Sequence, residues 1–129
     1  MGARVPKAMI SIVDDDETAR EGTMDLIKSM GFVAKAFPRA EDFLNSDHVH
    51  STSCLISDMR MPGMTGLELY NRLVASGNII PTILITAFPD ERDRRRAYQA
   101  GVIGYLAKPF NDEDLLTCVR SALESREEG

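Results

Sequence analysis

The sequence predicts a doubly wound α/β domain, in which one parallel sheet of five strands carries helices on both faces. Short apolar or β-branched runs alternate five times with stretches whose apolar residues recur at helical spacing. The run Thr82–Thr86 is almost entirely apolar or β-branched, which is typical of a strand covered on both faces. Because crossovers between parallel strands are right-handed, the alternation predicts a sheet between two layers of five helices in total.

Length and composition suit one domain with a single core, since the chain has 129 residues of which 43% are hydrophobic. We expect a flexible leader at residues 1–8, the domain at 9–124, and at 125–129 either a tail or the start of a linker. The net charge of -5 argues against a nucleic-acid surface as the main function. We find no apolar run of about 18 residues and no secretion signal, so we expect a cytoplasmic protein without a membrane span.

Five short runs have the composition of strands and end at turn or charged residues. In chain order they are Met9–Val13, Val33–Phe37, Cys54–Asp58, Thr82–Thr86 and Val102–Ala107. The third run is too short for a typical helix and is stopped by Pro62, Gly63 and Gly66, so it predicts a buried strand that delivers Asp58 into a turn. Taken alone, Asp58 is equally well explained as a cap of the next helix.

The first three predicted helices lie in the first half of the chain. One begins at Thr18 and stops at Gly31, and a short one lies at residues 41–44 before a polar loop at 45–53. The third follows Gly66, and its apolar face is formed by Leu69, Tyr70, Leu73 and Val74.

The last two predicted helices have recognisable start signals. Asp90 is a plausible cap of the fourth helix, which ends at Gly101. Asn111, with Asp114 three residues later, marks the start of the fifth. The buried stripe of the fifth helix is predicted to contain Leu115, Leu116, Val119, Ala122 and Leu123.

Polar residues follow four of the five predicted strands at their carboxyl ends. These are Asp14 and Asp15 after the first strand, Asp58 at the third, Thr86 at the fourth and Lys108 after the fifth. Alternation alone does not define the strand order, but the flavodoxin-like order 2-1-3-4-5 places the first and third strands side by side. That order brings the three aspartates together at the edge where open α/β sheets bind ligands.

Three adjacent carboxylates are expected to hold a proton or to attract a cation, because like charges raise the pKa of one member. Mg²⁺ (or Mn²⁺) fits such a site, since it prefers hard oxygen ligands and leaves room for a phosphate oxygen. With the charge neutralised, Asp58 can attack phosphorus as a nucleophile to give an aspartyl phosphate. Lys108 and Thr86 offer a cation and a hydroxyl for the oxygens of that product.

Four segments resemble the response-regulator receiver domains of two-component signalling, in order and spacing, over roughly residues 10–123. They are Ile12-Val13-Asp14-Asp15, Asp58-Met59-Arg60-Met61-Pro62-Gly63-Met64-Thr65-Gly66, Ile85-Thr86-Ala87 and Tyr105-Leu106-Ala107-Lys108-Pro109-Phe110. Details around Phe37, Met61-Pro62 and Lys108-Pro109-Phe110 look most like receivers that precede LuxR-type DNA-binding domains.

The resemblance implies that Asp58 accepts phosphate from a sensor histidine kinase or a phosphotransfer protein. It implies a metal site formed by Asp14, Asp15, Asp58 and the backbone carbonyl of Arg60. It further implies that Thr86, Tyr105 and Lys108 are the switch and phosphate-sensing residues, and that the bond between Lys108 and Pro109 is cis, which X-Pro sequences tolerate. The expected role is therefore signalling rather than metabolic catalysis, with only self-phosphorylation and self-dephosphorylation as chemistry.

The resemblance also implies an output surface on the fourth helix, fifth strand and fifth helix, and a possible homodimer through it. The fourth helix carries Arg92, Arg94, Arg95 and Arg96, which are otherwise explained as a solvated charged face. The chain ends at Gly129, just past the last predicted helix, so the expectation is either a stand-alone receiver or a piece of a longer regulator. DNA binding is expected only through an effector domain that this sequence does not contain.

Other classes fit less well. A flavin-binding module would need a Ser-, Thr- or Gly-rich phosphate loop where this chain has Asp14–Asp16, and a haloacid-dehalogenase phosphatase would need an acid where Arg60 stands. The remaining alternative is a receiver-like module for dimerisation or docking that is not phosphorylated.

His48 and His50 are interpreted as loop residues without a third metal ligand, and Cys54 and Cys118 as reduced, packed thiols.

Overall fold

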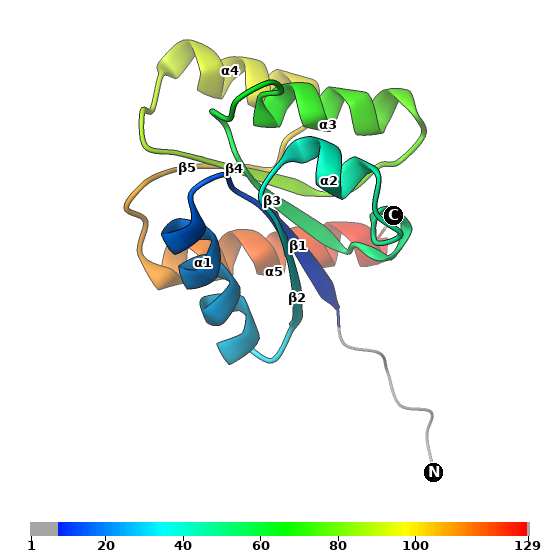
Figure 1. The fold of residues 1–129 in the computed structure, drawn as a ribbon, viewed down its shortest axis with the longest axis vertical. Coiled ribbons are helices and arrows are strands. Elements are labelled where there is room, and N and C mark those ends of the chain that lie inside the picture. The colour runs from blue at the N-terminus through cyan, green and yellow to red at the C-terminus, as the bar shows by residue number, and fades with distance from the viewer. Residues whose placement is uncertain (1–7, 129) are drawn as a thin grey trace.

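The structure is a computed structural model that describes residues 8–128, so the predicted leader lies outside it apart from Ala8. Five strands form one parallel sheet in the order β2-β1-β3-β4-β5, which confirms the predicted fold class and strand order (Figure 1). The strands are β1 (Met9–Val13), β2 (Val33–Phe37), β3 (Cys54–Asp58), β4 (Thr82–Thr86) and β5 (Gly104–Ala107). Within residues 8–128, no helix combines the length and the apolar character that a membrane crossing requires.

Helices alternate with these strands, as the sequence predicts. They are α1 (Glu17–Ser29), α2 (Ala40–Leu44), α3 (Gly66–Ala75), α4 (Glu91–Ala100) and α5 (Asp112–Glu128). The start of α1 is displaced from the predicted Thr18 because Asp16 is the cap, its side chain accepting a hydrogen bond from the amide of Ala19. Asp90 caps α4 as predicted, accepting hydrogen bonds from the amides of Arg92 and Asp93.

Two further predicted segments differ from the structure. The fifth strand begins at Gly104 rather than at Val102, because the amide of Val102 is still engaged by the carbonyl of Ala97 in the turn that ends α4. Gly101 makes that turn possible, since its φ of 115° is unfavourable for other residues. The predicted loop at 45–53 contains a short 3₁₀ helix at Val49–Ser51.

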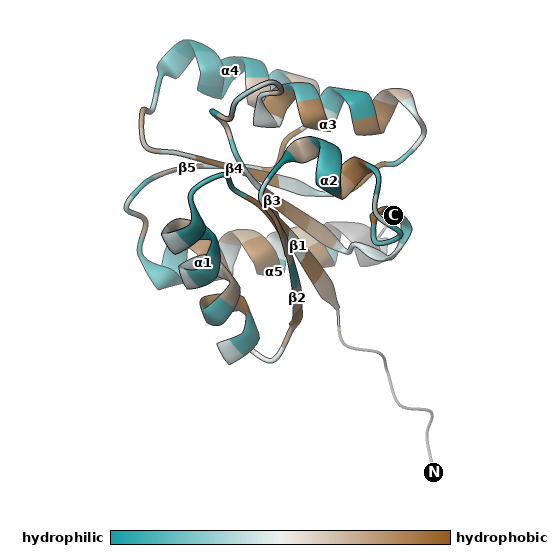
Figure 2. Cartoon of the chain, viewed as in Figure 1, coloured by the Kyte–Doolittle hydropathy of each residue, from teal (hydrophilic) through white to brown (hydrophobic). Residues whose placement is uncertain are grey.

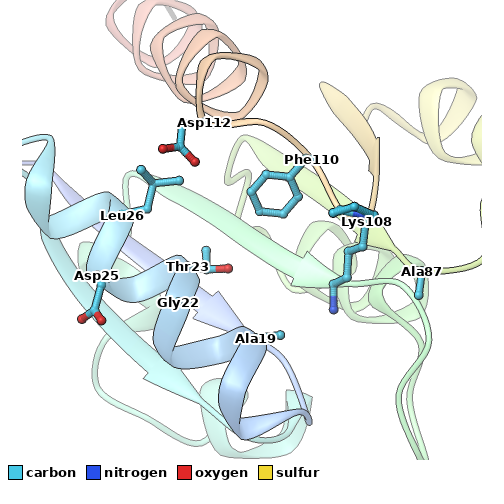
Figure 3. Close-up of a pocket in the computed structure, with 10 residues that line it drawn as sticks. Ala19, Gly22, Thr23, Asp25, Leu26, Ala87, Lys108, Phe110 and Asp112 are labelled. Carbon is cyan, nitrogen blue, oxygen red and sulfur yellow. The ribbon is translucent and has the colours of Figure 1, made fainter.

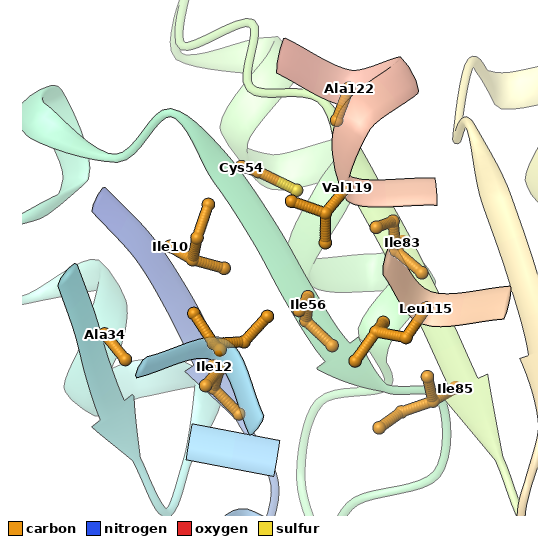
Figure 4. Packing of buried hydrophobic residues seen from close by; sticks show 11 residues of the cluster. Ile10, Ile12, Ala34, Cys54, Ile56, Ile83, Ile85, Leu115, Val119 and Ala122 are labelled. Atoms are coloured by element: carbon orange, nitrogen blue, oxygen red, sulfur yellow. The ribbon is translucent and has the colours of Figure 1, made fainter. Parts of the chain in front are cut away.

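The sheet lies between two layers of helices. α1 and α5 cover one face, and α2, α3 and α4 cover the other (Figure 1). The cluster on the α1/α5 face is drawn in Figure 4 and combines alternate residues of the central strands with those of α5, among them Ile10, Ile12, Ile56, Ile83, Leu115 and Val119. The hydropathy colouring shows apolar strands in the centre and a hydrophilic outer surface that is most continuous along α4 (Figure 2).

Gly66 allows α3 to start directly against the end of β3. Its amide donates a hydrogen bond to the carbonyl of Met59 at 2.9 Å. A Cβ atom there would lie 2.5 Å from the carbonyl oxygen of Asp58 and 2.9 Å from Cδ2 of Leu84. The preceding Thr65 forms a capping box with Glu68. The loop that follows Asp58 is therefore fastened at its far end, which holds that carboxylate at the edge of the sheet.

Candidate functional site

The structure brings Asp14, Asp15 and Asp58 together at the carboxyl edge of the sheet. One carboxylate oxygen of each lies within 4.8 Å of the others. The pairing of β1 with β3 explains this, because Val13 is in register with Ser57 and the residues that follow both therefore become neighbours. Asp14 is fully buried and Asp58 is 8% exposed, whereas Asp15 faces solvent. The cluster thus has two buried members and one that is open to an incoming ligand.

Lys108 reaches the same cluster from the end of β5. Its Nζ lies 2.9 Å from Oδ2 of Asp14 and 3.5 Å from Oδ2 of Asp58. The backbone amide of Lys108 donates to the carbonyl of Thr86 at 2.7 Å, and the Lys108–Pro109 peptide bond is cis. Partial burial opposes the charge on Lys108, but the hydrogen bond and charge of Asp14, with help from Asp58, outweigh it and raise the pKa of the ammonium group.

Burial raises the pKa of the Asp58 carboxyl to about 6. The Lys108 ammonium opposes this shift, and the negative charge of Asp14 adds to it. From the sequence, repulsion among the carboxylates is the expected cause of a raised pKa. The structure corrects the order of causes, because removal of Asp58 from water is the larger effect. A bound cation would stabilise the ionised form of this carboxyl group and so lower its pKa.

Thr86 and Tyr105 lie on neighbouring strands but face different surroundings. Thr86 is fully buried, and its Oγ1 accepts a hydrogen bond from the amide of Phe88 at 3.0 Å. Tyr105 is half-buried, and its hydroxyl oxygen accepts a hydrogen bond from the amide of Asp90 at 3.3 Å. The tyrosine hydroxyl therefore reaches the start of α4, next to the loop that carries Phe88.

Arg20 is a contact of the site that the sequence analysis does not single out. Its Nη1 donates to the backbone carbonyl of Asp14 at 2.8 Å and so connects α1 to the acidic loop. The available signal is position, since Arg20 stands near the start of the helix that immediately follows the aspartates.

A second missed contact joins the loop after Asp58 to α4. Nη2 of Arg60 lies 2.6 Å from Oδ2 of Asp93. These two residues are 33 positions apart, and no local pattern pairs them.

The histidines and cysteines lie outside the acidic cluster. The ring of His48 packs beside that of Phe37 with centroids 6.1 Å apart, and neither His48 nor His50 belongs to the metal-compatible group among the described residues. Cys54 and Cys118 are free thiols, and burial raises the pKa of Cys54 to about 12. A thiol with such a pKa is a packing group rather than a nucleophile.

The donor set suits a small, hard divalent cation. Asp14, Asp15 and Asp58 would supply three carboxylate oxygens, so an octahedral ion would still take further ligands such as water or phosphate. Mg²⁺ prefers this arrangement of a few carboxylates and several non-protein ligands. The arrangement defines a class of α/β protein in which carboxylates and a paired lysine gather at the carboxyl edge of a parallel sheet, a set of groups that suits a cation together with an anionic ligand.

The family follows from comparison with known proteins. The model of the response regulator receiver domain family matches residues 10–120, and the chain belongs to that family. Receiver domains are signalling domains of two-component systems, and they bind Mg²⁺ at an acidic aspartate cluster. Response regulators receive phosphoryl groups from histidine kinases and carry output domains.

Individual relatives agree with this assignment. The chain is 40% identical to the response regulator protein TmoT of Ectopseudomonas mendocina over 92% of its own length and 54% of the relative's. It is 34% identical to the transcriptional regulatory protein FixJ of Bradyrhizobium diazoefficiens over 94% of its length and 59% of the relative's. The structure of response regulator StyR superposes with a TM-score of 0.87 at 40% identity, covering 95% of this chain and 62% of that one. The chain thus spans little more than half the length of these curated relatives.

Proposed function

We propose that Asp58 is the residue that accepts the phosphoryl group. The observation that carries this proposal is the position of Asp58 between a metal-compatible carboxylate cluster and the Lys108 ammonium 3.5 Å away. Asp14 is fully buried and already bound by Lys108 at 2.9 Å, whereas Asp15 is exposed, and the ion pairs of Lys108 within the described part of the chain are with Asp14 and Asp58. Asp58 belongs to the metal-compatible cluster and contacts Lys108, and its side chain keeps 11% of its exposure where that of Asp14 keeps none.

The donor in this proposal is a phosphohistidine of a sensor kinase or of a phosphotransfer protein. A carboxylate oxygen of Asp58 forms a bond to phosphorus while the phosphorus–nitrogen bond of the donor breaks, and the released imidazole takes up a proton from solvent. Mg²⁺ (or Mn²⁺), held by Asp14, Asp15, Asp58 and the backbone carbonyl of Arg60, would neutralise charge on the phosphoryl oxygens. The domain catalyses only its own phosphorylation and dephosphorylation.

Lys108 changes partner in this reaction. In the structure its ammonium contacts both Asp14 and Asp58, and a phosphoryl group on Asp58 would present oxygens with nearly two negative charges to the same ammonium. A flexible lysine stem can follow that charge with little movement of the backbone. Lys108 thus supports the ionised acid before transfer and the aspartyl phosphate after it.

A hollow beside the site offers a place for the donor. It has a volume of about 800 Å³ and lies between α1 and the turn after β5, with Lys108 at one end (Figure 3). Its lining is mostly apolar and includes Ala19, Thr23, Leu26, Pro109 and Phe110. A donor histidine must approach Asp58 from outside the sheet edge, and this apolar surface would hold the protein that carries it. We therefore propose that this hollow receives part of the protein that carries the donor histidine.

The output surface in this proposal comprises α4, β5 and α5. Thr86 moving toward the phosphoryl oxygens would release the amide of Phe88, and Tyr105 would then leave the amide of Asp90. The surface would serve a homodimer or an effector domain, and DNA would be reached only through such a domain. The similarity to FixJ, a transcriptional regulatory protein, supports an effector that acts in transcription, and we propose that this effector is of the LuxR type.

The direct test is the intact mass after incubation with acetyl phosphate and Mg²⁺. We expect a gain of about 80 Da that disappears in Asp58→Asn and in the presence of a chelator. Asp15→Asn serves as a second control that retains the nucleophile but loses a metal ligand. A folded protein that gains no mass would contradict the proposal and would indicate a docking module of the receiver fold.

A further inference from the structure

Arg60 contacts two parts of the molecule that are otherwise separate. Its backbone amide lies 3.4 Å from Oδ1 of Asp58, in a long hydrogen bond. Its guanidinium extends in the other direction, to the carboxylate of Asp93 in the first turn of α4 at 2.6 Å. The Asp93 side chain is only 17% exposed, whereas that of Arg60 is 53% exposed. One residue thus joins the proposed phosphoacceptor to the helix on the output surface.

The start of α4 is held at a second point by Tyr105, whose hydroxyl accepts the amide hydrogen of Asp90. Asp93 follows Asp90 by one helical turn, so the two contacts fasten the same end of the helix. One contact comes from β5, and the other comes from the loop after β3. A change in either would therefore alter the position of the same turn of α4.

The charge balance at Arg60 depends on the state of Asp58. Before phosphorylation, Asp93 neutralises the guanidinium. A phosphoryl group on Asp58 would place nearly two negative charges beside the backbone of Arg60. A guanidinium can bind either a carboxylate or a phosphoryl group through two hydrogen bonds. The phosphoryl group carries more negative charge than a single carboxylate. Asp93 and the phosphoryl group would then compete for one cation.

We propose that Asp93 is a positioning residue that holds Arg60 on α4 while Asp58 is unmodified and releases it to the phosphoryl oxygens after transfer. The proposal rests on Asp58 being the phosphoacceptor. A contact that exists in only one of two states stabilises that state, so the Arg60–Asp93 pair opposes phosphoryl binding and restrains α4. The pair would couple the site to α4 in addition to the coupling proposed through Thr86 and Tyr105.

The test uses beryllium trifluoride with Mg²⁺ as a stable mimic of the aspartyl phosphate, with binding followed by NMR titration. We expect Asp93→Asn to tighten the binding by about two- to fivefold, the range that a partly exposed ion pair supports. Arg60→Gln should weaken binding, and adding Asp93→Asn to Arg60→Gln should then have no further effect. Asp93→Glu should restore the wild-type affinity.

Glu91→Gln is the matched control, because it removes the same charge from the same turn of α4. Glu91 lies 3.5 Å from Arg94 rather than near Arg60. Equal tightening by Glu91→Gln and Asp93→Asn would show a general charge effect and overturn the proposal. Tightening by Asp93→Asn that persists without Arg60, or no tightening at all, would overturn it as well.

Hydrogen exchange of the N-terminal part of α4 gives an independent readout. We expect the amides of residues 93–96 to exchange faster in unmodified Asp93→Asn than in the unmodified wild type. The difference between the two proteins should be smaller when the mimic is bound.

The proposal for Asp58 and the proposal for Asp93 are contradicted by different results. A wild-type protein that binds no mimic and gains no phosphoryl mass contradicts the role of Asp58. Normal phosphorylation of the wild type, with Asp93 and Arg60 variants that bind the mimic as the wild type does, contradicts only this inference.

Discussion

The Lys108 ammonium lies 2.9 Å from the carboxylate of Asp14, although the two residues are 94 positions apart in the chain. Asp14 is fully buried, and Lys108 retains only 19% of its side-chain exposure. A buried carboxylate needs such a partner, because leaving its charge unpaired in a low-dielectric surrounding is costly. The pair therefore has a structural role before any phosphoryl group arrives.

Replacing Lys108 with alanine should have opposite effects on stability and on metal binding. The unfolding free energy without metal should fall by about 1–3 kcal/mol, because Asp14 loses a charged hydrogen-bond partner. Mg²⁺ should bind several-fold more tightly, because the ammonium no longer repels it from Asp14 and Asp58. Urea denaturation and a metal titration measure the two effects. Lys108→Arg is the control that keeps the charge, and unchanged Mg²⁺ affinity in the alanine variant would refute the competition.

The stability contribution of Asp58 should depend on pH. Burial raises its pKa from 3.8 to about 6, so between these values the folded protein binds a proton that the unfolded chain does not. The associated stability is fully present below pH 3.8 and is lost as the pH rises through about 6. Asp58→Asn should therefore increase the unfolding free energy by about 1–2 kcal/mol more at pH 7.5 than at pH 4.

Urea denaturation without metal at several pH values measures this difference. Added Mg²⁺ should stabilise the wild type at pH 7.5 and leave Asp58→Asn nearly unaffected, because the metal favours the ionised carboxylate. An advantage of Asp58→Asn that is equally large at pH 4 and pH 7.5 would show that the carboxyl group is not perturbed.

Gly66 and Gly22 should respond oppositely to alanine. At Gly66 the new Cβ would meet the backbone oxygen of Asp58 at 2.5 Å, and that atom cannot move without shifting the site. We expect Gly66→Ala to lower the unfolding free energy by about 1–3 kcal/mol and to slow phosphorylation. Gly22 lies in α1 with nothing within 4 Å of its Cβ position, so Gly22→Ala should stabilise by up to about 1 kcal/mol. Similar effects at both positions would contradict the packing argument.

Thr86→Ala should leave phosphorylation intact and make the switch incomplete. A charge-assisted hydrogen bond contributes about 1.5–3 kcal/mol, whereas moving a switch from 1:99 to 99:1 requires about 5.5 kcal/mol. Lys108, the metal and a partner or dimer would supply the remainder. NMR of α4 and β5 with the phosphate mimic bound measures the switched fraction, and Thr86→Ser should retain it. A fully switched Thr86→Ala protein would remove the role of this hydroxyl.

Charge reversal at Arg95 and Arg96 tests the output surface. Both side chains are exposed on α4, so their replacement by glutamate should leave the fold and the rate of phosphorylation unchanged. Dimerisation or effector binding of the phosphorylated protein should weaken, as measured by analytical ultracentrifugation. Arg72→Glu is the control, compared with each single reversal, since it reverses one exposed arginine on α3 rather than on α4. Loss of both phosphorylation and association would instead indicate a damaged fold.

Local patterns predicted most of the fold. The five strands and five helices follow from periodicity and caps, because those signals depend on residues within one or two turns of each other. The predicted bounds were wrong where a backbone group forms its hydrogen bond with a neighbouring element. The amide of Val102, for example, donates to the carbonyl of Ala97 at the end of α4 and does not start β5. The convergence of Asp14, Asp15 and Asp58 was also predictable, since parallel strands end at one edge.

The sequence by itself determined the class of fold, the edge at which the site lies and the residue types that gather there. The tertiary structure alone decided which of these groups contact each other: Lys108 binds Asp14 more closely than Asp58, and Arg60 turns toward Asp93. It also decided that burial is the main cause of the raised pKa of Asp58. The physical reason is range, because propensity and periodicity act between chain neighbours, whereas ion pairs and desolvation depend on how distant segments pack.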